Sequence, residues 1–165
     1  MALDYFDNDT GHHICVHIRR EDFMLYGVYE YSTENFTRAS VLYLRAKLHE
    51  SGKNTTVAIL GDDRLWAQAL FANDTWIRVP TIPARPTTDY AFFARHCHTI
   101  LLTASASTFG FWSAYISSAE IVYYNVEYAM DKDFQGNFVP ADIFPPTWIP
   151  LQLNSSNNVI TEVAR

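Results

Sequence analysis

The sequence contains little that would place the chain in a membrane or on a nucleic acid. Among its 165 residues, no apolar run is long enough to cross a bilayer, and the first residues lack the basic and apolar regions of a signal peptide. Positive charge is also scarce. The formal net charge is -6, whereas nucleic acids and anionic membrane surfaces need a basic face. We therefore expect a soluble chain that binds neither nucleic acid nor, by itself, a membrane.

Cysteine is rare. Cys15 and Cys97 are too few for a disulfide framework, and both lie in apolar runs, where a small buried thiol is the commoner state. The cysteines therefore do not identify the compartment. Acceptor sites for N-glycosylation are more informative, because they matter only in a secretory lumen. Five such sites suggest a lumenal history, and a missing amino-terminal segment would reconcile it with the lack of a signal peptide. The sites begin at Asn8, Asn35, Asn54, Asn73 and Asn154.

Several common nucleotide-binding and hydrolytic motifs are also missing. The sequence has no Gly-x-x-x-x-Gly-Lys loop, and no Gly-x-Gly-x-x-Gly follows its first apolar segment, which disfavours an ATPase or an NAD-linked dehydrogenase. The absence of Gly-x-Ser-x-Gly argues against a hydrolase built on Ser107. The run His96-Cys97-His98 offers zinc ligands, but no paired ligand spacing accompanies it, so packing is the better interpretation. We expect no metal site.

The sequence does contain enough apolar material for a substantial core. Hydrophobic residues make up 48% and aromatic residues 15% of the chain, and its length is typical of a single globular domain. Segments with strand-like and helix-like patterns alternate at the spacing of βαβ units. Strands are expected over 14–18, 56–60, 76–79, 99–103 and 121–124, and helices over 34–50, 64–71, 89–95 and 108–117.

This alternation predicts a doubly wound, Rossmann-like α/β fold with a mostly parallel sheet over residues 12–150. Beyond the fifth strand the prolines interrupt the pattern, so residues 151–165 are expected to form an irregular tail.

The connections are expected to follow ordinary capping rules. Residues 21–31 are polar and rich in tyrosine, which predicts a loop between the first strand and the first helix. Ser32 or Thr33 is expected to cap that helix, and Thr87 or Thr88 is expected to cap the fourth segment with a helical pattern.

Polar side chains follow three of the expected strands. Arg19 and Arg20 follow the first, Asp62 and Asp63 follow the second, and residues 105–108 follow the fourth. Because ligands of open α/β sheets gather outside the carboxyl ends of the strands, these groups should face one crevice. Guanidinium groups and the free amides of a helix start suit a diphosphate, and a carboxylate can accept two hydrogen bonds from guanine. The arrangement predicts a nucleotide site, with a strand-end ion pair and a helix cap as the open alternatives.

Four blocks of the sequence resemble one family of enzymes. The run His17-Ile18-Arg19-Arg20-Glu21-Asp22 is similar to the His-x-Arg-Arg-x-Asp signature of fucosyltransferases. The other three blocks resemble, in order, the second, third and closing blocks of the α-1,2-fucosyltransferases of glycosyltransferase family 11. They are Gly61-Asp62-Asp63 with Trp66, the stretch from Asp89 to Tyr115, and Pro145-Pro146-Thr147-Trp148. Four blocks in the right order are more specific than any one of them.

The resemblance implies a galactoside 2-alpha-L-fucosyltransferase-like enzyme that moves L-fucose, with inversion, from GDP-fucose to a galactose hydroxyl of a glycan. It also implies a two-domain fold and a place in the Golgi lumen, where full-length members are membrane-anchored. No metal or cofactor beyond the donor substrate GDP-fucose is implied. The chemistry agrees with the charges: departure of a nucleotide diphosphate builds negative charge, and fixed guanidinium groups offset it.

The resemblance also implies roles for individual residues. Arg19 and Arg20 would be catalytic, because they would bind the diphosphate and stabilise charge on the departing GDP. The other implied residues position the arginine loop, contact guanine, or line the phosphate and fucose. They are, in that order, His17 and Asp22; Asp89 and, as a second candidate, Asp63; and Ser107, Thr108 and Phe109.

Three departures from the family pattern affect these expectations. Gly110 and Phe111 replace the usual Ser-Trp, which removes a hydroxyl from the start of a helix. Glu21 stands where Gly or Thr is usual, and we expect it to pair with Arg20 and compete with phosphate. The signature begins near the start of the chain and not well inside it, so the chain resembles the donor-binding half alone. The resemblance supplies no general base. An inactive or truncated module that only binds a nucleotide sugar is therefore the alternative to a complete fucosyltransferase.

Overall fold

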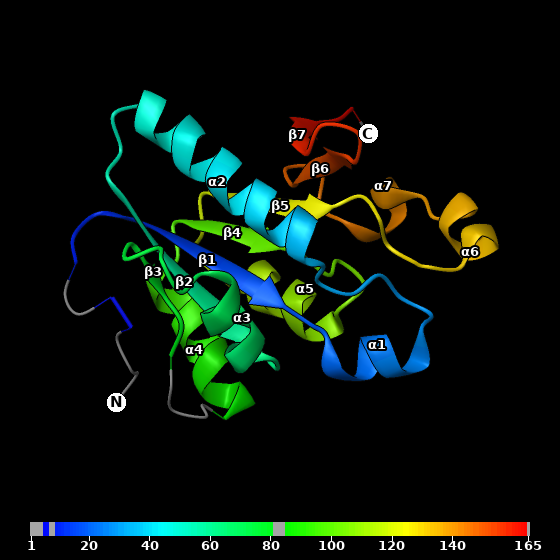
Figure 1. Ribbon diagram of the computed structural model, residues 1–165, viewed down its shortest axis with the longest axis horizontal. Helices are drawn as coiled ribbons and strands as arrows, with labels where there is room; N and C mark the ends of the chain where they lie inside the picture. The colour runs from blue at the N-terminus through cyan, green and yellow to red at the C-terminus, as the bar shows by residue number, and fades with distance from the viewer. Residues whose placement is uncertain (1–4, 7–8, 81–84, 165) are drawn as a thin grey trace.

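The computed structural model describes residues 5–6, 9–80 and 85–164. The described chain forms three layers, with helices on both faces of one sheet of seven strands (Figure 1). The strands are β1 (His12–Ile18), β2 (Thr55–Gly61), β3 (Ile77–Arg78), β4 (Thr99–Leu102), β5 (Ile121–Asn125), β6 (Ile149–Asn154) and β7 (Val159–Glu162). The helices are α1 (Glu21–Tyr26), α2 (Glu34–Glu50), α3 (Arg64–Leu70), α4 (Pro86–His96), α5 (Thr108–Tyr115), α6 (Lys132–Gly136) and α7 (Pro140–Ile143).

The sheet has the order β3-β2-β1-β4-β5-β6-β7, and every pairing is parallel except β6 with β7. All seven residues of β1 are buried, as expected of a central parallel strand covered on both faces. The strand order reverses between β1 and β4, which is the topological switch point of a doubly wound sheet. The prediction of a Rossmann-like, mostly parallel α/β fold is therefore confirmed.

Two hydrophobic clusters hold the layers together, one on each face of the sheet. On one face, α2 and α3 pack through Phe36, Val41, Leu44 and Ala67 against alternate residues of the strands. On the other face, α4 contributes Phe92 and α5 contributes Ala114, among others. Because side chains alternate across a strand, neighbours such as Ile14 and Cys15 belong to different clusters.

The predicted helices are present, and two of their caps explain where they begin. Thr33 accepts a hydrogen bond from the amide of Phe36, so it is the cap of α2. Ser107 accepts from the amide of Gly110 and caps α5. The predicted cap of α4 at Thr87 or Thr88 is wrong, because this helix already begins at Pro86, and proline suits the first helical position.

The carboxyl-terminal segment is not irregular, and the predicted tail over 151–165 is wrong. Residues Ile149–Asn154 and Val159–Glu162 form an antiparallel hairpin that extends the sheet beyond β5. Leu151 and Ile160 are buried in the cluster beneath α2, so apolar burial compensates for the prolines that precede the hairpin. Asn158 adopts a positive φ of 54° in the hairpin turn, a conformation that asparagine tolerates.

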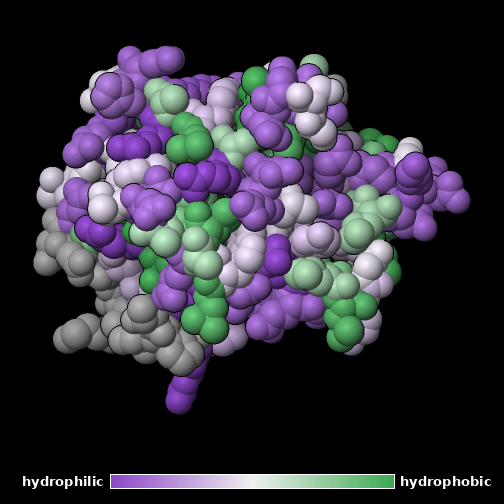
Figure 2. Space-filling view, in the orientation of Figure 1, coloured by the Kyte–Doolittle hydropathy of each residue, from purple (hydrophilic) through white to green (hydrophobic). Residues whose placement is uncertain are grey.

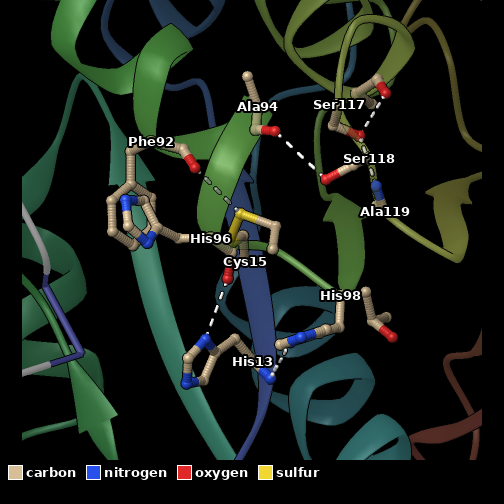
Figure 3. The surroundings of a disulfide bond; sticks show 12 residues. His13, Cys15, Phe92, Ala94, His96, His98, Ser117, Ser118 and Ala119 are labelled. Carbon is tan, nitrogen blue, oxygen red and sulfur yellow. Dashed lines mark hydrogen bonds between the residues drawn. A yellow bond between two sulfur atoms is a disulfide. The ribbon is translucent and has the colours of Figure 1, made fainter. Parts of the chain in front are cut away.

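Cys15 and Cys97 are buried as predicted, but they form a disulfide and are not free thiols. Figure 3 shows the bond between β1 and the segment that leads from α4 into β4. The two residues are 82 positions apart, and only the adjacency of β1 and β4 brings their Cα atoms to 5.6 Å. Both neighbours of Cys97 contact His13. The amide of His13 donates to Nδ1 of His98, and Nδ1 of His13 lies 3.0 Å from the carbonyl oxygen of His96.

The surface seen in Figure 2 is mostly hydrophilic, with apolar side chains in separate small groups. One such group lies over α1, where Met24, Leu25 and Tyr26 are exposed. In the part of the chain that the structure describes, no helix combines the length and the apolar character needed to cross a membrane.

Candidate functional site

A cavity of about 650 Å³ opens at the carboxyl ends of β1 and β2, beside the switch point. This volume and this place are typical of a small-molecule site in a doubly wound sheet. Its described lining comes from the ends of β1 and β2, from the segment after β3, from α3, and from the starts of α1, α4 and α5. The lining residues are His17, Arg19, Glu21, Gly61, Asp62, Asp63, Arg64, Leu65, Gln68, Pro80, Pro86, Asp89 and Phe109.

Arg19 presents a fixed positive charge to this cavity. Its Nε lies 2.7 Å from Oδ1 of Asp22, and its Nη2 donates to Oδ2 at 2.8 Å, so the carboxylate holds the guanidinium at two points. This hydrogen bond lowers the pKa of Asp22 below its usual range. Nε of Arg19 also lies 3.6 Å from Oδ2 of Asp62, so a second carboxylate neighbours the guanidinium. The sequence-based expectation that Asp22 positions an arginine agrees with this geometry.

Arg20 lies outside the cavity, so it does not have the position expected of a residue that binds the diphosphate. Its guanidinium stacks on Trp66, 4.0 Å from the ring centroid, and its Nε pairs with Asp63 at 3.1 Å. Its Nη1 donates to the carbonyl of Ser32, and its side chain is only 12% exposed. Consecutive residues at a strand end point to opposite sides, so only one of the two arginines reaches the cavity. Arg20 instead ties the end of β1 to α3 and to the segment before α2.

The expected partnership of Glu21 with Arg20 is not formed. Asp63 is the acidic partner of Arg20, and Glu21 is an exposed residue of the cavity rim. The loop expected over 21–31 is in part the helix α1, because Asp62, which follows β2, supplies a cap. Its carboxylate accepts hydrogen bonds from the amides of Arg20 and Glu21, each at 3.1 Å. A cap contributed by a residue 41 positions away has no local sequence signal.

Asp63 has a structural task besides its contact with Arg20. It accepts a hydrogen bond from the amide of Trp66 at 3.1 Å and so caps α3. The interpretation of the adjacent aspartates as helix caps is therefore confirmed, with the addition that they cap two different helices. Asp63 still lines the cavity, beside its neighbours Asp62 and Arg64.

Arg64 and Asp89 form an ion pair in the wall of the cavity. Nη2 of Arg64 donates to both carboxylate oxygens of Asp89, each at 2.8 Å. Asp89 is only 4% exposed, so burial raises its pKa while the nearby guanidinium acts in the opposite direction. The sequence reasoning missed Arg64. A basic residue at the first position of a helix is unfavourable beside the helix dipole, and that anomaly was the available signal of a dedicated acidic partner.

His17 lies at the back of the site and is almost completely buried. Its Nε2 is 2.9 Å from Oγ of Ser107, which also accepts from the amide of Gly110. The hydroxyl hydrogen of Ser107 is then free to donate to a neutral imidazole. Burial, with Arg19 as a second cause, lowers the pKa of His17 from 6.5 to about 3, so the ring stays neutral. Its Nδ1 is buried and has no hydrogen-bond partner among the described residues.

The start of α5 contributes less to the cavity than expected. Of the three residues assigned there, only Phe109 lines the cavity, with its ring 5.6 Å from that of His17. Ser107 is buried as a helix cap, and Thr108 is exposed outside the lining. The structure thus brings five of the nine predicted site residues to the cavity wall and leaves four outside it. Those at the wall are His17, Arg19, Asp63, Asp89 and Phe109, and those outside are Arg20, Asp22, Ser107 and Thr108.

Comparison with known proteins agrees with this geometry. The family described as "Glycosyl transferase family 11" matches residues 1–152. The chain belongs to glycosyl transferase family 11.

Several curated relatives of this family 11 chain carry fucosyltransferase names. It is 30% identical over 160 residues to "Putative galactoside 2-alpha-L-fucosyltransferase svh-11" of Caenorhabditis elegans, a match that covers 92% of this chain and 44% of that protein. It is 31% identical over 155 residues to a "Galactoside 2-alpha-L-fucosyltransferase" of the same organism, covering 90% of this chain and 42% of that protein.

A mammalian relative matches over a shorter stretch. "Galactoside alpha-(1,2)-fucosyltransferase 1" of Saimiri sciureus is 34% identical over 73 residues, which is 44% of this chain and 19% of that protein. The family 11 chain thus spans less than half the length of the curated relatives that it matches. No solved structure is significantly similar to it.

The resemblance to family 11 is confirmed, and the fold shows how its blocks are used. The first three blocks meet at the cavity through Arg19, Asp63 and Phe109. The closing block does not line it. Trp148 is buried in the cluster beneath α4 and α5, where its ring lies 5.2 Å from that of Phe111 on α5. Chemically, the family 11 cavity offers one guanidinium for an anion and a mixed donor and acceptor pair at Arg64 and Asp89.

Proposed function

We propose that this family 11 chain binds GDP-fucose in the cavity between β1, α3 and α5 and takes part in transferring L-fucose, with inversion, to a galactose hydroxyl of a glycan. The observation that carries the proposal is Arg19, which reaches the cavity at the carboxyl end of β1 and is held by Asp22. A guanidinium fixed in this way is arranged before a ligand arrives, so its side-chain entropy is not lost on binding.

In the proposed complex the diphosphate lies against Arg19. When the bond between fucose and GDP breaks, negative charge grows on the departing diphosphate, and the guanidinium stabilises that charge. Arginine cannot lose its proton at physiological pH, and its hydrogen bond to Asp22 raises its pKa further. Because the protein supplies this charge, we propose that transfer requires no divalent cation.

The guanine ring of GDP-fucose would lie toward the ion pair of Arg64 and Asp89. A carboxylate can accept hydrogen bonds from the ring N–H and the amino group of guanine. The guanidinium of Arg64 can donate to the carbonyl oxygen of guanine. Burial raises the pKa of Asp89, whereas the two hydrogen bonds from Arg64 favour its charged form. Phe109 and His17 would form the apolar side of the same cavity.

Arg20 has a different part in this proposal from the one that its motif implies. It acts as a positioning residue, because its contacts with Asp63, Trp66 and Ser32 fix the loop that carries Arg19. The Golgi lumen, with an anchor supplied by a longer protein, is the proposed place of action.

A second candidate function is a module that binds the nucleotide sugar but does not transfer the sugar. It is favoured by one observation: of the two arginines to which the motif gives catalytic roles, Arg19 lines the cavity and Arg20 lies outside it.

The test is calorimetric titration of the folded chain with GDP and GDP-fucose, with and without a chelator of divalent metals. We expect binding that the chelator leaves unchanged, that Arg19→Ala reduces at least tenfold, and that Arg95→Ala leaves unchanged. Arg95 is a matched control because it is an exposed arginine of α4 outside the cavity lining. If the folded wild-type chain binds neither ligand, the donor site is wrong. If it binds GDP-fucose but fucosylates no galactoside acceptor, the binding module is the correct alternative.

A further inference from the structure

Two of the five glycosylation acceptor sites lie in exposed turns outside the helices. Asn73 is in the turn between α3 and β3, and Asn154 ends β6 at the start of the hairpin turn. Asn73 and Thr75 are exposed, and so are Asn154, Ser155 and Ser156. A large hydrophilic substituent can therefore project into solvent from either asparagine without displacing a packed side chain.

The other described acceptor sites are more constrained by the fold. Asn35 lies in the first turn of α2, and the hydroxyl residue of its site, Thr37, is fully buried. Asn54 precedes β2, and the hydroxyl of Thr56 in its site donates a hydrogen bond to Asp9. Asn8 lies outside the described residues.

The two exposed sites lie next to the two edges of the sheet. Asn73 precedes β3, which is one edge strand, and Asn154 lies in the hairpin that ends with β7, the other edge strand. Figure 1 shows these strands at opposite ends of the sheet. Edge strands present unpaired backbone groups that can pair with another chain, and proteins usually protect them. A bulky carbohydrate beside each edge would hinder such pairing.

The disulfide between Cys15 and Cys97 is an independent sign of the compartment in which the chain folds. Disulfides form and persist in oxidising compartments, and they are rare where glutathione and thioredoxin keep thiols reduced. Both cysteines are buried, and the described part of the chain has no free cysteine. The disulfide and the acceptor sites therefore agree on a secretory lumen, which is also where oligosaccharides are attached to asparagine.

We propose that Asn73 and Asn154 carry N-linked oligosaccharides and protect the two edges of the sheet. In the reaction, Nδ2 of the asparagine bonds to C1 of an oligosaccharide that a lipid pyrophosphate carries. The bond from C1 to the pyrophosphate oxygen breaks, the lipid pyrophosphate leaves with the electron pair, and the amide loses one proton. The host's oligosaccharide transferase supplies the catalysis.

The proposed glycans are attached outside the lining of the cavity at the ends of β1 and β2. Neither Asn73 nor Asn154 is among the residues that line it. This inference does not rest on the proposed function, because it depends only on exposed acceptor sites, sheet topology and the disulfide.

The test uses the full chain behind a secretion leader, both secreted from a eukaryotic host and translated in vitro with endoplasmic-reticulum microsomes. Peptide mapping after enzymatic release of glycans in heavy-oxygen water marks each formerly glycosylated asparagine as labelled aspartate. We expect label at Asn73 and Asn154, and a Cys15–Cys97 disulfide in the non-reduced map. Thr75→Ala and Ser156→Ala should each remove one glycan step on a gel, and the double variant should remove both.

Matched variants separate glycosylation from folding. Thr75→Ser and Ser156→Thr keep the acceptor sites and should keep both glycan steps. The microsome experiment reports modification even if a variant is not secreted. An unlabelled Asn73 or Asn154 in the wild-type product of both systems would overturn the proposal, and so would labelled chains whose two cysteines remain reduced.

Discussion

Gly110 lies directly against the ring of His17: a Cβ atom at this glycine would be 2.3 Å from Cδ2 of the imidazole. The contact joins the start of α5 to the end of β1, and it explains why glycine follows Phe109 in the first turn of a helix, where it lowers intrinsic helix stability. The ring is also held by Ser107, so it cannot move aside cheaply.

Replacing this glycine should therefore destabilise the protein. We expect Gly110→Ala to lower the free energy of unfolding by about 1–3 kcal/mol, the usual result of overpacking a filled core. Urea unfolding followed by circular dichroism measures the loss. Gly136→Ala is the matched control, because a Cβ there meets nothing within 4 Å. Equal stability of Gly110→Ala and the wild type would show that the ring of His17 is not fixed as described.

His17 should make stability depend on pH in a defined direction. Burial lowers its pKa from 6.5 to about 3, so below pH 6.5 the unfolded chain takes up a proton that the folded chain refuses. The contribution of neutral His17 to the free energy of unfolding is therefore fully present above pH 6.5. It is lost as the pH falls toward 3, at up to about 1.4 kcal/mol per pH unit.

The non-titrating variant His17→Gln tests this dependence. It should be less stable than the wild type near neutral pH, and the gap should narrow on acidification. Urea unfolding of both proteins at about pH 7.5, 6 and 5 measures the gap. His12, whose pKa burial lowers to about 4, is present in both proteins, so its contribution cancels in the difference. A gap that stays constant with pH would show that His17 takes up its proton equally in both states.

Removing Asp22 should weaken binding at Arg19 while leaving the arginine charged. Both side chains are more than a third exposed, so solvent screening makes the pair worth only about 0.5–1 kcal/mol. We therefore expect Asp22→Ala to raise the dissociation constant for GDP about two- to fivefold, much less than Arg19→Ala. Glu50→Ala, at an exposed position at the end of α2, is the control for loss of a surface acid. A tenfold or larger effect of Asp22→Ala would mean that this carboxylate contacts the ligand itself.

The carboxyl-terminal hairpin should contribute to the stability of the core. Leu151 is fully buried in the cluster beneath α2, so Leu151→Ala is expected to cost about 2–4 kcal/mol. Gln152→Ala, at the exposed neighbouring position of the same strand, should change stability by less than about 0.5 kcal/mol. Thermal and urea unfolding of both variants give the comparison. If Leu151→Ala were as stable as the control, the hairpin would not be part of the folded core.

The disulfide should stabilise the chain because it closes a long loop. For a separation of 82 residues, the loss of unfolded-state entropy corresponds to about 4.5 kcal/mol. The double variant Cys15→Ala/Cys97→Ala should unfold at a correspondingly lower urea concentration. Reduction of the wild type provides a check without substitution. If reduced and oxidised wild type unfolded at the same urea concentration, the cross-link would add nothing to stability.

Strand positions could be predicted from the sequence because parallel strands buried on both faces are continuous apolar runs. The central strand ending at Ile18 is one such run, and helix caps such as Thr33 obey local rules. The family was also predictable, since its blocks are contiguous. Which side chains reach the cavity could not be predicted. Nothing local distinguishes Arg19 in the cavity from Arg20 beside Trp66.

Three long-range contacts, two of them at the site, lie beyond local sequence rules. Asp62 caps α1 across 41 positions, Arg64 pairs with Asp89 across 25, and Cys15 pairs with Cys97 across 82. Each depends on which strands become neighbours, so each follows from topology and not from spacing. The hairpin of β6 and β7 was missed for a related reason, because burial against α2 decides its structure more than the local turn signals do.

The helix α1 forms one edge of the cavity mouth, and it is anchored at both ends. Asp62 binds the amides at its start, and after Gly27 the chain pairs with the segment that follows β5, through the bridge of Tyr29 with Ala129 and the hydrogen bond from Met130 to Val28. These contacts hold both ends of α1 in place, so the helix is a fixed part of the cavity mouth and not a movable lid. A ligand enters without first ordering it, so association should be fast and selection should act on the shape of the opening.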